Sequence, residues 1–321
     1  MIDRRHLLAA GAAAVPGAAL AQATAPLPSW PPAEAVPLWQ AGAIRVPPGL
    51  RPEPTITDRP GGYRDIQLRG TIQPLFGVFR PARPDGRGVL IIPGGGYSIT
   101  SQRNEGIDVA QALLPHGITC FVLAYRLPGE GWADRANVPL ADAQRAMRLI
   151  RYEARRYAID PGKLGCIGFS AGGHLAGSLA TLSDVEAYAP IDRADRDSAR
   201  PDWTGLMYAV STVDPGRSHG GSRQQLLGPD PDPRMQERYA VDRRITRTTP
   251  PLFLVHAQDD QTVPVTNSLD SFAAARVARV PVEAHFLERG GHGFGTRLPR
   301  DNPGSLWPEM FARWSWLHSF G

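Results

Sequence analysis

Lysine and cysteine are almost missing from this sequence. Among its 321 residues Lys163 is the single lysine, so the 35 basic residues are nearly all arginines, and they are scattered among 31 acidic residues. A nucleic-acid-binding protein gathers its basic residues in a patch or stripe. The scatter therefore excludes nucleic acid as the expected partner, although the formal net charge is +4.

Clusters of metal-ligating residues are missing as well. The two cysteines, Cys120 and Cys166, each stand inside an apolar run, and no Cys or His cluster has the spacing of a metal site. We therefore expect no metal and no other cofactor. Both cysteines are expected to pack as small hydrophobic side chains.

Residues 1–23 are predicted to be a signal peptide. Arg4 and Arg5 precede an alanine- and glycine-rich stretch that ends in Ala21-Gln22-Ala23, and the paired arginines resemble a twin-arginine signal. The apolar stretch is too short, and with Pro16 too interrupted, for a membrane-spanning helix. The sequence thus predicts a periplasmic or secreted protein without a membrane span.

The remaining chain divides into two parts. Residues 24–60 are rich in proline, which predicts an irregular N-terminal segment. Residues 61–321 alternate strand-like and helix-like runs, which predicts one α/β domain. Its runs 63–68 and 75–79 are expected to pair as antiparallel edge strands. Two polar segments, residues 183–203 and 214–239, are long for loops, which predicts short helices or a cap over a pocket.

The most informative motif is Gly168-Phe169-Ser170-Ala171-Gly172. It follows the apolar run 164–167 and precedes the helix-like run 173–182, which is the strand, turn and helix context of a nucleophile elbow. Glycines two positions before and after the serine let strand and helix approach without a Cβ clash. In a chain with 34 glycines the motif alone also fits an ordinary tight turn. Ser170 is the candidate nucleophile.

Two further pieces of an acyl-transfer site follow Ser170 along the chain. The strand-like run 252–256 leads into Asp259 and Asp260, so a carboxylate emerges at the end of a strand. The run 282–287 leads into a glycine-rich loop that carries His292. The order serine, aspartate, histidine is the one that the α/β-hydrolase fold requires.

A glycine run precedes Ser170. The buried strand-like run 89–92 ends in Pro93-Gly94-Gly95-Gly96-Tyr97. The bare backbone of such a run can turn N–H groups toward a developing oxyanion.

With these motifs the chain resembles the α/β-hydrolases, and within them the secreted esterase/lipase group that contains acetyl esterases and acetylxylan esterase-like proteins. The resemblance covers most of the chain after residue 35. It rests on Val36-Pro37-Leu38-Trp39, Pro93-Gly94-Gly95-Gly96-Tyr97, Asn104-Glu105-Gly106, Tyr125-Arg126-Leu127-Pro128, Gly168-Phe169-Ser170-Ala171-Gly172-Gly173-His174, Asp260 and Gly291-His292-Gly293-Phe294-Gly295. It implies the α/β-hydrolase fold over residues 61–321: a mostly parallel central sheet flanked by helices on both faces, with polar cap-like insertions. Pro93 departs from the wider lipase/esterase pattern, in which a histidine opens the glycine run.

The serine needs a base, and the expected base is His292, because an imidazole titrates near neutral pH. Of the remaining histidines we retain only His174, on the helix after Ser170, as an alternative with a direct role in catalysis. The others lie in strands, in loops or near the C-terminus: His116, His219, His256, His285 and His318.

A carboxylate must fix the tautomer of His292. Asp260 is preferred because Asp-x-x-Val-Pro matches the motif of the resembling group, in which a histidine, here His256, precedes the acid by four residues. Asp259 stays as the alternative. The oxyanion hole is expected to consist of the N–H of Ala171 and that of Gly95 or Gly94. Tyr97 is expected to line the substrate pocket, and Glu105 to hold the glycine loop in place.

The predicted activity is that of a serine carboxylesterase that hydrolyses small acyl esters through an acyl-enzyme. The acetyl group and a carbohydrate alcohol such as a xylan fragment are implied by the resemblance, so the expected substrate is a small-molecule or oligosaccharide ester. Alternatives are a lipase, a peptidase of the same fold, or a hydrolase-fold protein that binds without turnover. The charged cap-like segments disfavour the lipase.

The resemblance also bears on the two cysteines. In the α/β-hydrolase sheet the strands with Cys120 and Cys166 are separated by the strand at 89–92, which puts them roughly 9 to 10 Å apart. We therefore expect two free thiols and no disulfide.

Overall fold

A central eight-stranded sheet organises the chain. The computed structural model describes residues 27–321, so the predicted signal peptide, residues 1–23, lies outside the described residues. In spatial order the strands are β1 (Ala35–Pro37), β4 (Leu75–Phe79), β7 (Thr119–Ala124), β5 (Gly86–Ile92), β8 (Ile159–Phe169), β9 (Thr204–Met207), β10 (Leu252–Ala257) and β11 (Val282–Leu287). The pairs from β7 to β11 are parallel, and β4 is antiparallel to both of its neighbours.

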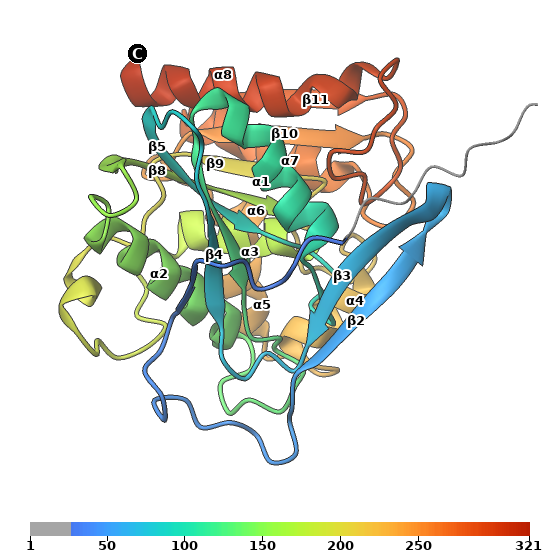
Figure 1. Cartoon of the computed structure of the whole chain (residues 1–321). Helices are drawn as coiled ribbons and strands as arrows, with labels where there is room; N and C mark the ends of the chain where they lie inside the picture. Colours follow the sequence, from blue (N-terminus) through green and yellow to red (C-terminus); the bar gives the residue numbers. More distant parts are fainter. Residues whose placement is uncertain (1–26) are drawn as a thin grey trace, which may run out of the picture.

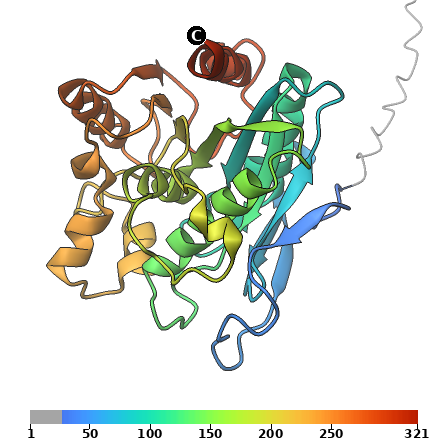
Figure 2. The ribbon, with the colours of Figure 1, turned by 90° about the vertical axis from the view of Figure 1, so that its left-hand side faces the viewer.

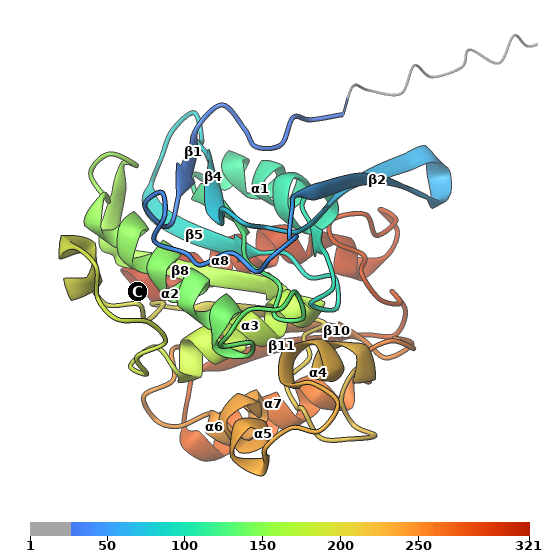
Figure 3. The ribbon, with the colours of Figure 1, turned by 90° about the horizontal axis from the view of Figure 1, so that it is seen from below.

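Helices cover both faces of this sheet (Figures 1 and 3). One face carries α2 (Asn137–Tyr152), α3 (Ser170–Thr181), α6 (Val241–Arg244) and α7 (Thr266–Ala278), and the other carries α1 (Asp108–Leu113) and α8 (Trp307–Phe320). Neighbouring residues of β5 serve opposite faces, since Leu90 packs in the α2/α3 core and Val89 in the α1/α8 core. A strand buried on both faces reads as a continuous apolar run. The predicted mostly parallel sheet between two helical layers is confirmed.

One predicted strand pairing is wrong. The runs 63–68 and 75–79 are both strands, but β3 (Tyr63–Arg69) pairs with β2 (Glu53–Arg59) and β6 (Thr100–Ser101) in a separate sheet. The turn η1 (Pro60–Gly62) closes this hairpin with positive φ at both glycines, which a tight reversal favours. The β2–β3 hairpin projects from the body of the molecule (Figure 1).

The expectation that residues 24–60 lack regular structure is wrong as well. Their described part supplies β1 to the central sheet and β2 to the hairpin. Proline is tolerated there because β1 is an edge strand that ends at Pro37, and β2 is an edge strand of the second sheet. The high proline content of this segment is thus compatible with edge strands and does not indicate irregular structure.

The two polar cap-like segments contain short helices, as predicted. Residues 183–203 hold η4 (Arg193–Arg196), which Arg145 of α2 fixes through Asp192 and Asp195. Residues 214–239 hold α4 (Gly220–Leu227) and α5 (Pro233–Tyr239), and α5 packs against α6 (Figures 2 and 3). The remaining short turns are η2 (Arg103–Ile107), η3 (Leu114–His116) and η5 (Pro303–Leu306).

The sheet order explains why the two cysteines form no disulfide. β5 lies between β7, which carries Cys120, and β8, which carries Cys166. Both thiols are free and buried, as predicted. Among residues 27–321 no helix combines the length and the apolar character needed to cross a membrane.

Candidate active site

Ser170 stands at a sharp turn between strand and helix. β8 ends at Phe169 and α3 begins at Ser170, whose φ of +53° is unfavourable for a residue with a side chain. A Cβ on Gly172 would lie 2.2 Å from the carbonyl oxygen of Ile92, and one on Gly168 would lie 2.1 Å from that of Gly172. Only glycine fits at both positions. The strained turn therefore lifts the serine above the end of the sheet.

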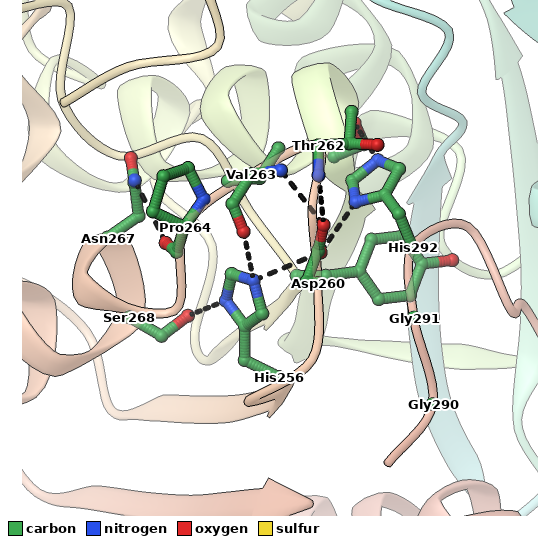
Figure 4. A network of polar contacts seen from close by, with 12 residues as sticks. His256, Asp260, Thr262, Val263, Pro264, Asn267, Ser268, Gly290, Gly291 and His292 are labelled. Atoms are coloured by element: carbon green, nitrogen blue, oxygen red, sulfur yellow. Dashed lines mark hydrogen bonds and ion pairs between the residues drawn. The ribbon is translucent and has the colours of Figure 1, made fainter. Parts of the chain in front are cut away.

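Three side chains meet at this point. The Ser170 hydroxyl donates to Nε2 of His292 over 2.8 Å. The Nδ1–H of His292 in turn donates to Oδ2 of Asp260 over 2.7 Å (Figure 4). We refer to Ser170, His292 and Asp260 as the triad. Such a chain of hydrogen bonds can remove the serine proton and stabilise the imidazolium that results.

Asp260 is held as an anion. Its Oδ1 accepts the backbone N–H groups of Thr262 and Val263, and its Oδ2 also lies 3.2 Å from Nε2 of His256 (Figure 4). Burial opposes ionisation, but the hydrogen bonds from His256 and His292 hold the pKa of Asp260 well below its ordinary value. Asp260 therefore remains charged at neutral pH.

His256 is a partner of Asp260 that sequence reasoning set aside as a strand residue. Its Nε2–H donates to the carbonyl of Val263 over 2.9 Å, so Nδ1 accepts from the hydroxyl of Ser268 over 2.8 Å (Figure 4). The ring is fully buried at the end of β10. His256 thus ties the turn that carries Asp260 to the strand below it. Its position four residues before the acid was the available signal.

Asp259 binds a different part of the loop. Its Oδ1 accepts the backbone N–H groups of Gly290 and Gly291 over 2.9 and 2.8 Å. Asp260, not Asp259, thus contacts His292, whereas Asp259 fixes the backbone just before it.

The glycine run lies beside Ser170, and its N–H groups differ in availability. Gly94 donates its N–H to Oε2 of Glu105 over 2.8 Å, so it is not free to face a substrate. Among the described residues no atom accepts a hydrogen bond from the N–H of Gly95, which lines the pocket with a φ of +129°. Ala171, next to the nucleophile, also has no partner for its N–H among them. The structure therefore favours Gly95 over Gly94.

Glu105 connects the glycine run to the histidine loop. Besides Gly94, its carboxylate accepts from the hydroxyl of Tyr208, which in turn accepts the N–H of Gly295 over 3.0 Å. Burial raises the pKa of Glu105, while the charge on His292 and these hydrogen bonds oppose that rise. The prediction that Glu105 holds the glycine loop is confirmed, and the same carboxylate also steadies the loop of His292.

Tyr97 does not line the pocket, contrary to prediction. Its side chain is 1% exposed, and its hydroxyl donates to Nδ1 of His174 over 2.9 Å. The Nε2–H of His174 donates to the carbonyl oxygen of Tyr239, so this ring is a buried link between the glycine run, α3 and α5. The alternative of a direct role for His174 finds no support, because its ring does not reach the pocket.

A polar cavity of about 380 Å³ opens in front of Ser170 and His292. Its wall comes from the glycine run, from the β2–β3 hairpin and from the cap-like segment 214–239. Its lining residues are Arg59, Gly95, Gly96, Ser98, Ile99, Ser101, Asn104, Glu105, Ser170, His219, Thr262, His292 and Gly293. Sequence reasoning missed Arg59 and His219, because nothing in a loop sequence shows which cavity the loop will border.

The triad order along the chain and the sheet that carries it are those of an α/β-hydrolase. Within this class the chain belongs to the BD-FAE family, whose profile matches residues 79–274, more than half of the chain.

Known proteins similar to the chain include carbohydrate-active enzymes. An acetylxylan esterase of Xylanibacter ruminicola is 35% identical over 221 residues, which are 68% of this chain and 43% of that protein. An endo-1,4-beta-xylanase B of Butyrivibrio fibrisolvens is 37% identical over 229 residues, 71% of this chain and 34% of that protein. The chain thus spans less than half the length of both relatives.

A solved structure is similar over nearly its whole length. The acetyl ester-xyloside bifunctional hydrolase from Caldicellulosiruptor lactoaceticus matches with a TM-score of 0.71 and 32% identity. The match covers 88% of this chain and 94% of that one. This similarity agrees with the α/β-hydrolase fold described above.

Proposed function

We propose that the protein is a serine carboxylesterase that removes acetyl groups from hydroxyl-rich alcohols such as acetylated xylan fragments. The observation that carries the proposal is the continuous hydrogen-bond chain of the triad, which ends at a serine facing an open, polar cavity. Support for the carbohydrate comes from the similarity to an acetylxylan esterase and to an acetyl ester-xyloside hydrolase.

In the proposed reaction the Oγ of Ser170 attacks the ester carbonyl while its proton passes to Nε2 of His292. The negative charge that develops on the carbonyl oxygen faces the N–H groups of Ala171 and Gly95. As the tetrahedral intermediate collapses, His292 returns the proton to the departing alkoxide, and the acyl group remains on the serine. Water then attacks the acyl-enzyme by the same path, which releases the carboxylic acid.

The lining of the cavity supports a short acyl group. Apart from glycines, its lining side chains are polar except for Ile99, so no group of large apolar side chains is present to enclose a long acyl chain. Each methylene that is buried gains about 0.8 kcal/mol, and a chain that stays in water gains nothing. The alternative of a lipase is disfavoured on the same ground.

The nucleophile is tested by Ser170→Ala, with Ser305→Ala as a control outside the cavity. We expect Ser170→Ala to fold normally and to lose at least about a hundredfold in ester hydrolysis, because only the triad serine can form the acyl-enzyme. A fluorophosphonate should label the parent protein once per chain and leave Ser170→Ala unlabelled. Absence of labelling in the parent protein would favour the alternative of a non-catalytic binding protein.

The substrate is tested with two series. Catalytic efficiency should be higher for p-nitrophenyl acetate than for p-nitrophenyl octanoate, and acetylated xylo-oligosaccharides should release acetate. Efficiency that rises steadily from acetate to octanoate would instead indicate a deep apolar acyl site and a lipase.

We also propose that the protein is exported, because residues 1–23 combine paired arginines, an alanine-rich stretch and the Ala21-Gln22-Ala23 site. N-terminal sequencing of the protein from its native host tests this proposal. A mature protein that retains Arg4 and Arg5 would overturn it.

A further inference from the structure

His219 borders the cavity beside the triad, although it comes from a distant part of the chain. It lies in the cap-like segment 214–239 and is half-buried. It caps the N-terminus of α4, and its ring stands next to Gly96, where a Cβ would lie 3.6 Å from its Cε1. The cap-like segment therefore brings an imidazole to the edge of the glycine run.

The tautomer of His219 follows from its contacts. The backbone N–H of Ser222 donates to Nδ1 over 3.2 Å, and the Ser222 hydroxyl lies 2.8 Å from the same atom. Since an N–H can only donate, Nδ1 must be the unprotonated nitrogen, and the ring proton sits on Nε2. Burial lowers the pKa of His219, and the nearby His292 lowers it further, while the negative charge of Asp260 opposes this shift without reversing it. At neutral pH the ring is thus a neutral imidazole with its N–H on Nε2.

Outside the triad, three side chains with nitrogen donors line the cavity. Arg59 has an ion-pair partner in Asp65 at 3.5 Å, and Asn104 donates to the carbonyl of Gly293 over 2.9 Å. The Nε2–H of His219 has no acceptor among the described residues. Of these three side chains, Arg59 and Asn104 thus already have a partner within the protein, whereas the neutral N–H of His219 has none among the described residues.

An acetyl ester offers few acceptors for such a donor. In the proposed reaction the carbonyl oxygen faces Ala171 and Gly95, and the rest of the acetyl group is a methyl. Every other hydrogen-bonding atom of the substrate lies in its alcohol portion. Xylan fragments carry further hydroxyl groups and a ring oxygen there, whereas the p-nitrophenyl portion carries only a nitro group, which is a weak acceptor, at the far end of its ring.

We propose that the Nε2–H of His219 donates to a hydroxyl or ring oxygen of the alcohol portion and thereby selects acetylated sugars over apolar acetyl esters. His219 is in this proposal a substrate-binding residue. The inference rests on the proposed esterase function and specifies which residue recognises the sugar.

The decisive variant is His219→Asn. Asparagine is a preferred N-cap, so its side-chain oxygen can still accept the N–H of Ser222, but its shorter side chain places its NH2 group away from the position that Nε2 occupies. Asp232→Ala is the matched control, because it removes the N-cap of α5 in the same segment without touching the cavity. A general loosening of the segment would affect both variants, whereas loss of the donor affects only the first.

Three measurements decide the proposal: kcat/KM for a monoacetylated methyl xyloside, kcat/KM for p-nitrophenyl acetate, and inhibition of the latter reaction by xylotriose. We expect His219→Asn to lower the first about five- to tenfold, the size of one neutral hydrogen bond, and to weaken inhibition by a similar factor. The rate on p-nitrophenyl acetate should change less than about twofold, because its alcohol portion has no hydroxyl or ring oxygen to accept the Nε2–H.

Equal losses of kcat/KM on both substrates, or an unchanged kcat/KM for the xyloside ester, would overturn the role of His219. Neither result would contradict the proposed esterase function. Absence of xylotriose inhibition in the parent protein would overturn the role of His219 too, even if the sugar ester is a poor substrate. If the parent protein hydrolyses neither ester, the proposed function fails first, and the inference falls with it.

Discussion

His174 makes the stability of the protein depend on pH in a way that one substitution can isolate. The ring is buried, with Nδ1 accepting from Tyr97 and the Nε2–H donating to Tyr239. Burial lowers the pKa of His174 to about 4, because a charged ring would lose its hydration there. The ordinary pKa of a histidine, which applies to the unfolded chain, is about 6.5.

Between these two pKa values the unfolded chain binds a proton that the folded protein rejects. The contribution of His174 to the free energy of unfolding is therefore complete above pH 6.5 and is lost as the pH falls toward 4. With these pKa values the loss between pH 7 and pH 4.5 amounts to about 2.5 kcal/mol in the free energy of unfolding. In a His174→Gln variant this pH-dependent part of the free energy of unfolding is absent, because glutamine does not titrate.

Urea unfolding at pH 7 and pH 4.5 measures the effect. The difference in free energy of unfolding between parent and His174→Gln should shrink by about 2.5 kcal/mol at the lower pH. Ser178→Ala, a buried change on the same helix that does not titrate, should cost the same at both pH values. If the parent and His174→Gln differ equally at both pH values, the folded protein accepts a proton on His174 and the reasoning is wrong.

Two further predictions concern the loops around the triad. Asp260→Asn should lower kcat by about 10³- to 10⁴-fold because His292 loses the partner that sets its tautomer, whereas Asp259→Asn should cost less than about tenfold because an amide oxygen still accepts the two glycine N–H groups. The reverse ranking would assign the acid to Asp259. Glu105→Gln should cost about 1 to 3 kcal/mol in the free energy of unfolding, measured in urea, because a glutamine has one side-chain oxygen and cannot accept from both the Tyr208 hydroxyl and the Gly94 N–H. An unchanged midpoint would refute that link.

The elements around Ser170 were predictable because their causes are local. A strand, a tight turn and a helix follow one another within residues 159–181, and the two glycines are required by contacts with the neighbouring backbone. The order of β7, β5 and β8 was also predictable, because the resemblance to the α/β-hydrolases fixes it. From this order it followed that the two cysteines lie on strands that are not neighbours and therefore form no disulfide.

The incorrect or undecided predictions concern features that depend on tertiary contacts. The alternation of apolar residues predicted β3 and β4 as strands but does not encode their partners, and the hairpin with β2 depends on the turn at Gly61 and Gly62. Tyr97 follows the glycine run in the sequence, yet its ring turns inward to His174. The choice between Gly94 and Gly95 likewise depends on Glu105, whose contact with one N–H leaves the other free.

The loop that carries His292 shows how a glycine-rich segment can be ordered from outside. It has little structure of its own, but Asp259 holds the backbone at Gly290 and Gly291, and Asp260 holds the ring. Glu105 steadies its far end through Tyr208 and Gly295. Each of these carboxylates lies outside the loop, so the imidazole is positioned before substrate arrives and the ordering cost is met during folding. For this reason the sequence of the loop alone reveals the histidine but not its orientation.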